Sequence, residues 1–468
     1  MGYVHEQVGA VAATVSSGVL FYFGTGLTPV AALTWLAPLP VLLLATRAHA
    51  RTALPAAFLA YLGGTANIWA WSLRSHDLPL LPWGLVVSVC LSATFVLAVA
   101  LFRRLVLLGH AWLGALAASA VWTGVLYLVT LLNPKGLTDT FATAQADVPV
   151  VVQTVSITGS WGLEFLVLLV PAAAAAVLAP TVRRVARIRT GAFILGVTAL
   201  VLIGGVIRLT SEPIAPQRMA VVSANMHGWA ADVGTPAGKA LVDSYVHRIA
   251  ALPSGVRTIV LPEGTFGATE PSPPVLVDRF RALARDRQAV LVVGYAQWAK
   301  NAKYNYALVF PADGSAPLRY LKHHDAVSPP GHDLVVHDDT GVEICLDVNF
   351  AEPSRDYATA GATRLAVPAS DEGDDGWLHS RTALLRGAEN GLPVVWGGRQ
   401  TRQMISDGWG RVVADVPSGV DPSGFTTLVA EVGSGPGPTW YTRLGDWFAW
   451  LCLVVSAAGM AVAVRVRR

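Results

Sequence analysis

Long apolar segments separated by short polar connections dominate the first 211 residues of the chain. Seven such segments precede residue 212 and an eighth lies near the C-terminus, each close to the ~20 residues that a helix needs to span a bilayer. So many apolar segments with so few charges are not explained as buried helices of a soluble domain. The pattern predicts a polytopic α-helical membrane protein of about eight spans. The segments are residues 8–23, 29–45, 53–71, 82–107, 111–132, 162–178, 192–209 and 447–464.

The pattern changes between residues 212 and 440, where short β-branched or apolar runs alternate with helical patterns. This alternation is typical of an α/β domain with sheets covered by helices, and the stretch is long enough for one such core. We therefore predict seven spans in residues 1–211, the α/β domain in 212–440, and a last span with a basic tail in 441–468. The expected strands are residues 219–223, 258–261, 290–293, 307–310, 342–345, 364–367, 394–396 and 411–414, and the expected helices are 238–251, 274–286 and 377–390.

The composition supports this mixed architecture and excludes some functions. Hydrophobic residues make up 53% of the chain and charged residues only 14%, which is too apolar for an ordinary soluble enzyme. The formal charge is only +3, and the arginines lie beside apolar segments instead of in a patch with interleaved aromatic residues, which disfavours nucleic-acid binding. The spans lack the midplane ionisable residues expected of a transporter.

Positive charge alternates between the connections of the apolar segments and predicts the orientation of the chain. Arginines cluster after the second, fourth, sixth and last segments, whereas the intervening connections carry little more than Arg74 or Lys135. By the positive-inside rule, both termini are cytoplasmic and residues 212–440 lie outside the cytoplasm. Residues 1–7 contain no Lys or Arg, so we interpret the first segment as a retained span and not as a signal peptide.

Glu263, Lys322 and Cys345 each follow an apolar run directly in the predicted α/β domain. The carboxyl ends of strands line the functional crevice of open α/β folds, so these three side chains are expected to converge. The trio suits covalent acyl transfer: a thiolate attacks a carbonyl, a carboxylate accepts the thiol proton, and an ammonium with backbone N–H groups stabilises the oxyanion. Taken singly, the residues also fit a turn carboxylate, a solvated amine and an inert core thiol.

The other two cysteines, Cys90 and Cys452, lie inside apolar segments, where a thiol is usually a small hydrophobic side chain. Three scattered cysteines form neither a disulfide framework nor a metal-ligand spacing. The histidines at positions 323, 324, 332 and 337 also fit no standard ligand pattern. We therefore predict no metal and no cofactor.

Seven stretches of the chain carry recognisable motifs: residues 261–264 (Leu-Pro-Glu-Gly), 320–324 (Tyr-Leu-Lys-His-His), 344–347 (Ile-Cys-Leu-Asp), 385–395 and 407–412 in the domain, and 154–165 and 439–447 outside it. Those in the domain resemble the motifs of nitrilase-type domains, and the chain as a whole resembles the apolipoprotein N-acyltransferase family. The resemblance implies an αββα sandwich in which Glu263 is the general base, Lys322 the oxyanion-stabilising cation and Cys345 the nucleophile that carries the acyl group as a thioester.

The resemblance also implies the substrates and the location. A phospholipid donates the acyl chain and the N-terminal amine of a diacylglyceryl-cysteine lipoprotein accepts it, so ping-pong kinetics are expected. Both substrates are lipid-anchored, which suits a multi-pass protein of the inner or plasma membrane, with a monomer favoured. Two alternatives remain open: a membrane-tethered nitrilase-like amide hydrolase in which water resolves the thioester, and a degenerate, non-catalytic membrane partner.

The surroundings of the trio depart from the family pattern. Where the family has Val-Pro-Phe-Gly-Glu after the lysine, residues 326–332 read Ala-Val-Ser-Pro-Pro-Gly-His, so that His332 stands near the position of a supporting glutamate. The nucleophile is followed by Leu346 and Asp347 instead of Tyr, or a similar side chain, and Glu. We expect Leu346, Asp347 and His332 to form the oxyanion site and the immediate surroundings of the trio.

Overall fold

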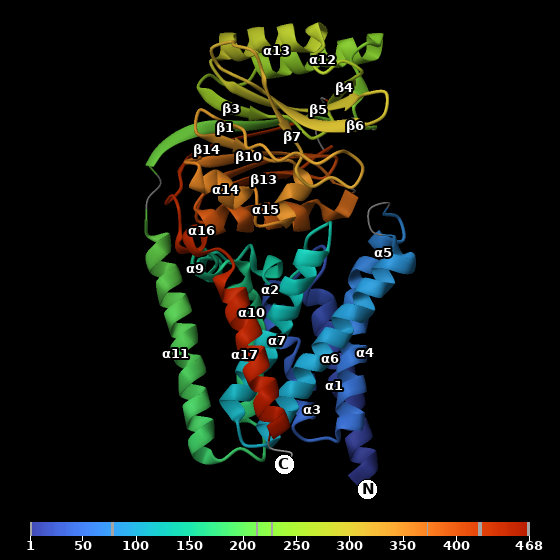
Figure 1. Cartoon of the computed structure of the whole chain (residues 1–468), viewed down its shortest axis with the longest axis vertical. Helices are drawn as coiled ribbons and strands as arrows, with labels where there is room; N and C mark the ends of the chain where they lie inside the picture. Colours follow the sequence, from blue (N-terminus) through green and yellow to red (C-terminus); the bar gives the residue numbers. More distant parts are fainter. Residues whose placement is uncertain are drawn as a thin grey trace. The chain divides into compact units, whose positions relative to one another are not determined.

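The computed structural model describes residues 2–75, 79–211, 214–225, 228–371, 373–419 and 424–465. The chain forms two compact units, which Figure 1 shows in the colours of the sequence. In sequence, the second unit is inserted before the final helix of the first. The helical unit contains Met1–Leu132, Asp139–Arg208 and Leu444–Arg468, and the α/β unit contains Asn133–Thr138 and Leu209–Arg443.

Six helices in the described part of the helical unit are long and apolar enough to cross a membrane. Each of them corresponds to one of the eight apolar segments of the sequence. They are α1 (Gly2–Gly24), α6 (Leu85–Leu107, continued from a helical turn at Leu80), α7 (Ala111–Leu132), α10 (Ser160–Val177), α11 (Arg184–Leu209) and α17 (Trp447–Arg465).

The other two predicted spans are interrupted. Two short helices meet at Pro38 in the second segment, because proline lacks the backbone N–H that a continuous helix needs. A 3-10 turn interrupts the third segment before its last helical turn. The number of segments that cross the membrane therefore stays a prediction. The elements are α2 (Ala31–Leu36), α3 (Leu39–Ala45), α4 (Ala50–Gly64), the 3-10 turn Thr65–Ile68 and α5 (Trp69–Ser72).

Helix α7 lies at the centre of the helical unit, where it packs against α6, α10 and α17. Its Trp122 stacks on Phe141 with ring centroids 5.0 Å apart and contacts Tyr61 at 5.3 Å. Glu164 of α10 accepts a hydrogen bond from the Trp122 indole at 2.6 Å and another from the Ala142 backbone N–H at 2.8 Å. A buried carboxylate thus ties a loop to two helices.

Two mixed β-sheets form the core of the α/β unit. The first has the order β14-β1-β3-β5-β4-β2, with β6 paired to β5 and β7 to β6, and the second has the order β13-β12-β11-β10-β9-β8. The strands are β1 (Ile214–Ala224), β2 (Ala231–Asp232), β3 (Val256–Val260), β4 (Phe266–Ala268), β5 (Val290–Trp298), β6 (Lys303–Phe310), β7 (Leu318–Leu321), β8 (Val336–His337), β9 (Thr340–Val342), β10 (Arg364–Ser370), β11 (Val394–Arg399), β12 (Arg402–Ser406), β13 (Val412–Pro417) and β14 (Phe425–Ser434).

The two sheets lie face to face between two layers of helices (Figure 1). Contacts of β1 with β11, and of β10 with β3 and β5, join the sheets. Helices α12 (Pro236–Ala250) and α13 (Pro274–Arg287) cover the first sheet, and α14 (Ser354–Thr359) and α15 (Gly376–Asn390) cover the second. The predicted layered α/β class is confirmed, and the layers form an αββα sandwich.

Apolar strands buried on both faces explain this layering. Parallel pairing joins β1 to β3 and β3 to β5, and Val222, Ile259 and Leu291 from these strands belong to one fully buried cluster with Phe280 of α13. Burial of such side chains stabilises the fold by roughly 1.5–3 kcal/mol each. Because the parallel strands run in one direction, their carboxyl ends share one edge of the sheet, where polar residues follow them.

Candidate active site

Cys345 lies in a tight turn and not in a strand. The strand predicted at residues 342–345 is displaced: β9 spans Thr340–Val342, and a 3-10 turn begins at Cys345. Cys345 itself has φ +45°, in the left-handed region that non-glycine residues rarely adopt. Such strain is typical of residues whose side chain must be presented in one direction.

Asp347 braces this turn from within. Its fully buried carboxylate accepts hydrogen bonds from the Ile344 N–H at 2.9 Å, the His324 N–H at 2.8 Å and the Tyr320 hydroxyl at 2.8 Å. Tyr320 lies in β7, His324 follows that strand and Ile344 begins the nucleophile turn, so Asp347 holds the segment of Lys322 against that of Cys345. This bracing agrees with the expectation that Asp347 belongs to the surroundings of the trio.

Glu263 and Lys322 form a buried ion pair. Lys322 Nζ donates to Glu263 Oε1 at 2.8 Å, and the side-chain amide of Asn305 donates to the same oxygen at 2.6 Å. The backbone carbonyl of Asn305, on β6, also accepts a hydrogen bond from the Lys322 backbone N–H at 3.0 Å. One residue that sequence reasoning missed thus aligns both members of the pair, and nothing in its local sequence, between two tyrosines, identifies it.

The carboxyl end of β10 brings the pair and the thiol together. The Glu263 N–H donates to the Ala369 carbonyl at 3.3 Å, and Cys345 Sγ lies 3.7 Å from the next carbonyl, that of Ser370. Two predicted site residues, far apart in the sequence, therefore contact consecutive residues of one strand. The structure brings Glu263, Lys322 and Cys345 into one buried cluster.

Burial and charge set the protonation of this cluster. Burial by itself lowers the pKa of the Lys322 ammonium, but the Glu263 carboxylate opposes it and the resulting pKa is raised, so the lysine stays charged. Burial raises the pKa of the Cys345 thiol well above its usual value, and the Glu263 charge raises it further, while Lys322 lowers it. The resting thiol is therefore protonated, and the chemistry needs a base beside it.

The remaining two predicted residues differ in position. Leu346 follows the nucleophile in the 3-10 turn and is half-buried, whereas the side chain of His332 is exposed, with its ring centroid 6.4 Å from that of His323. The turn places the backbone N–H of Leu346 directly after the nucleophile, and its part in an oxyanion site stays a prediction. The exposed side chain of His332 gives no structural support for the predicted role beside the buried trio, which stays a prediction.

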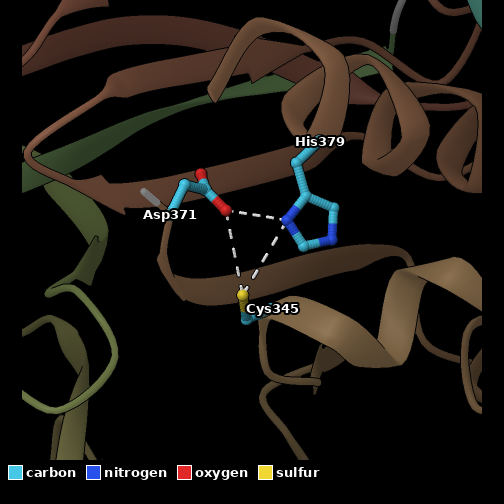
Figure 2. Close-up of side chains that lie close together, drawn as sticks. All are labelled: Cys345, Asp371 and His379. Carbon is cyan, nitrogen blue, oxygen red and sulfur yellow. Dashed lines mark hydrogen bonds and ion pairs between the residues drawn. The ribbon is translucent and has the colours of Figure 1, made fainter. Parts of the chain in front are cut away.

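Asp371 and His379 contact the nucleophile and were also missed by sequence reasoning. Figure 2 shows both side chains facing the sulfur: Asp371 Oδ1 and His379 Nδ1 each lie 3.9 Å from Cys345 Sγ and 2.7 Å from each other. Asp371 directly follows β10, so the rule that identified Glu263 would also have found it. His379 is the lone imidazole in the predicted helix 377–390, a weak signal.

Among the described residues, Cys345, Asp371 and His379 also form the one cluster with the donor set of a metal site.

The αββα sandwich and its buried Glu, Lys and Cys define the class of this domain. Residues 218–432 match the carbon-nitrogen hydrolase family, and residues 17–173 match the apolipoprotein N-acyltransferase N-terminal domain. The chain is thus a membrane protein that joins a nitrilase-type catalytic fold to a helical domain. It belongs to the apolipoprotein N-acyltransferase family, as the sequence predicted.

Known relatives extend this assignment along the chain. The chain is 25% identical to an apolipoprotein N-acyltransferase of Geobacter metallireducens, over 96% of this chain and 94% of that protein. It is 28% identical to an apolipoprotein N-acyltransferase of Thermotoga maritima, over 26% of this chain and 24% of that protein. Among solved structures, Saccharomyces cerevisiae Nit3 of the nitrilase superfamily is similar, with 20% identity, a TM-score of 0.39, and coverage of 47% of this chain and 91% of that one.

Proposed function

We propose that this protein transfers a fatty acyl chain from a phospholipid to the N-terminal amine of diacylglyceryl-cysteine lipoproteins, through a thioester on Cys345. Family membership along nearly the whole chain supports the substrates. The observation that carries the chemistry is the buried Glu263–Lys322 pair, which meets the Cys345 turn at the end of β10. Six helices long and apolar enough to cross a membrane support an enzyme that works on lipid-anchored substrates.

In the first half-reaction, Glu263 accepts the proton of the Cys345 thiol, and the sulfur attacks the ester carbonyl of the phospholipid. The negative charge that develops on the carbonyl oxygen is stabilised by the Lys322 ammonium and by backbone N–H groups such as that of Leu346. The C–O bond then breaks, and the departing lysophospholipid oxygen takes the proton from Glu263. The enzyme is left as a thioester.

In the second half-reaction, the acceptor amine attacks the thioester carbon, and Glu263 accepts the amine proton. The C–S bond breaks, the sulfur regains a proton, and the amide product leaves. One base serves both halves, because the departing alcohol and the incoming amine occupy the same position in turn. Ping-pong kinetics follow from this order of events.

The test is to incubate the purified protein with a phospholipid that carries a labelled acyl chain. We expect mass spectrometry of the intact protein to detect one acyl group, absent from C345A, which a diacylglyceryl-cysteine peptide discharges as an amide. Discharge by water at the same rate without the peptide would favour a hydrolase, and no adduct in a folded protein would favour a non-catalytic partner. The variants C90A and C452A serve as controls and should keep the adduct.

The location of the catalytic domain is part of the proposal. Alternating arginines favour cytoplasmic termini, with residues 212–440 outside the cytoplasm between spans in 1–211 and 441–468. A monomer is proposed as the working unit. In a C90A/C452A background, S272C on the exposed loop before α13 should react with an impermeant maleimide in right-side-out membranes. R184C, on the predicted cytoplasmic side, should react only in inverted membranes, and the reverse result would overturn the orientation.

A further inference from the structure

The Cys345 thiol faces two groups that the mechanism above does not use. Its sulfur lies 3.9 Å from Asp371 Oδ1 and 3.9 Å from His379 Nδ1, and these two atoms lie 2.7 Å apart (Figure 2). The Asp371 side chain is 1% exposed and that of His379 is 13% exposed. Because the sulfur is the reacting atom, a polar pair held against it bears directly on the chemistry.

The contacts of His379 indicate which ring nitrogen carries the proton. A carboxylate oxygen only accepts, so the contact of 2.7 Å with Asp371 places the hydrogen on Nδ1. Nε2 is buried and has no hydrogen-bond partner among the residues that the structure describes, a position better suited to a lone pair than to an N–H. The ring of Trp396 packs edge-on at a centroid distance of 4.9 Å and restrains the imidazole. The nearer Asp371 oxygen therefore accepts the one hydrogen on Nδ1 in the resting site, while the sulfur lies 3.9 Å from the same nitrogen.

We propose that His379 is a further catalytic residue of the acyl transfer: its Nδ1–H, bound to Asp371 in the resting site, shifts towards the Cys345 sulfur when negative charge develops there and stabilises the thiolate. This inference rests on the proposed function. It divides the chemistry between two groups: Glu263 transfers the protons, including that of the thiol, and His379 stabilises the negative charge on the sulfur through a hydrogen bond. Asp371 is a positioning residue, since it acts through the imidazole.

The donor has its largest effect when the thioester breaks. The C–N bond forms as the C–S bond breaks, and the electron pair of the C–S bond passes to the sulfur. A hydrogen bond from Nδ1–H stabilises that developing charge, and the amine proton held by Glu263 then returns to the sulfur, so that amide and free thiol form without net proton change. During loading, the same donor increases the thiolate fraction but lowers its nucleophilicity, so the two effects partly cancel.

Three other charged groups act on the sulfur from the surrounding elements, and a fourth, Arg399, lies next to one of its contacts. The negative charges of Glu263 after β3 and Asp371 after β10 disfavour ionisation of the thiol, and the positive charge of Lys322 after β7 favours it. Arg399 at the end of β11 donates to the Ser370 hydroxyl at 3.1 Å, beside the carbonyl that the sulfur contacts. The comparison of the two His379 variants therefore keeps these groups intact and changes only the donor at the position of Nδ1.

Two substitutions at His379 separate the donor from the packing of the ring. H379N places an amide nitrogen where Nδ1 was, H379Q places one near the position of Nε2, and both remove the ring from Trp396. In single-turnover assays with a fluorescent acyl phospholipid, H379Q should slow discharge by a diacylglyceryl-cysteine peptide about 10²-fold but slow loading only about tenfold. H379N should keep both rates within about tenfold of the wild type. D371A should show the same unequal loss as H379Q.

The controls make the outcome decisive. H247Q, on the exposed face of α12, repeats the substitution away from the site, and thermal unfolding of each variant in detergent reports whether it is folded. Equal rates for H379N and H379Q would overturn the inference. So would an H379Q variant that loses loading and discharge to the same extent. So would a stoichiometric metal in the purified protein whose removal abolishes loading, because the cluster would then be a metal site. Failure of the wild type to form any acyl-enzyme would instead refute the proposed function itself.

Discussion

Lys322 Nζ lies 2.8 Å from Glu263 Oε1, and the two side chains are only 8% and 6% exposed. A buried ion pair contributes little net stability relative to neutral groups of the same shape, but loss of one partner leaves a buried charge uncompensated. Asn305 completes this arrangement, because its amide and its carbonyl hold the two partners from β6. Stability and catalysis at this pair can therefore be tested separately.

Removal of one charge of the pair should destabilise the protein more than removal of both. K322M leaves Glu263 buried without its cation and should lower the free energy of unfolding by about 3–5 kcal/mol, whereas K322M/E263Q should recover most of that loss. Denaturant unfolding in detergent, with E263Q as the fourth corner of the cycle, measures the coupling. All three variants should fail to form the acyl-enzyme. A double variant no more stable than K322M would contradict the pairing.

Asn305 should affect turnover more than substrate affinity. N305A removes the donor that fixes the Glu263 carboxylate, and we expect kcat to fall about tenfold to a hundredfold with little change in KM. Steady-state transfer to a diacylglyceryl-cysteine peptide measures both parameters. The matched control is N301A, in the exposed loop between β5 and β6, which should behave as the wild type. An unchanged kcat for N305A would refute the positioning role.

Glu343 makes the stability of the α/β unit dependent on pH. Burial raises the pKa of its carboxyl to about 8, although the Ser354 hydroxyl, 2.8 and 2.9 Å from its two oxygens, favours the charged form. The folded protein thus binds this proton more tightly than the unfolded chain does. Its stabilising contribution is complete below the usual carboxyl pKa of 4.5 and is lost as the pH rises towards 8.

The substitution E343Q keeps a neutral side chain of the same shape at every pH. We expect the unfolding temperature of the wild type to fall between pH 5 and pH 8.5 relative to that of E343Q, and the two proteins to be most alike at the acidic end. Differential scanning fluorimetry in detergent across this range measures the difference. Parallel curves for the two proteins would show that Glu343 does not titrate in the folded state.

Position 264 requires a glycine because of its backbone conformation and a close contact with a neighbouring side chain. It has φ +55°, and a Cβ at this position would lie 2.2 Å from the indole nitrogen of Trp229. G264A should lower the free energy of unfolding by about 1–3 kcal/mol for the strained φ, and should slow loading because it displaces the neighbouring Glu263. G255A, with φ +78° and no atom within 4 Å of the added Cβ, is the matched control for strain alone. Equal loading by the two variants would exclude a role for the Trp229 contact.

Part of the fold followed from periodicity in the sequence. The runs at residues 258–261 and 290–293 became β3 and β5, and the pattern at 377–390 became α15, because burial of apolar strands and amphipathic helices depends on local spacing. The expected span at 29–45 was interrupted near Pro38, where hydropathy is insensitive to a missing backbone donor. The strand expected through residue 345 ended at Val342, since the left-handed φ of Cys345 leaves no trace in composition.

The sequence by itself determined the apolar segments, the layered α/β class and the three residues at the ends of apolar runs, because each of these depends on neighbours along the chain. Only the tertiary structure decided what surrounds the thiol. Asn305 reaches Glu263 through the pairing of β6 with β5 and β7, and His379 reaches Cys345 through the packing of α15 on the second sheet. Such contacts join residues tens of positions apart, and sequence spacing alone does not specify the strand register and helix packing that create them.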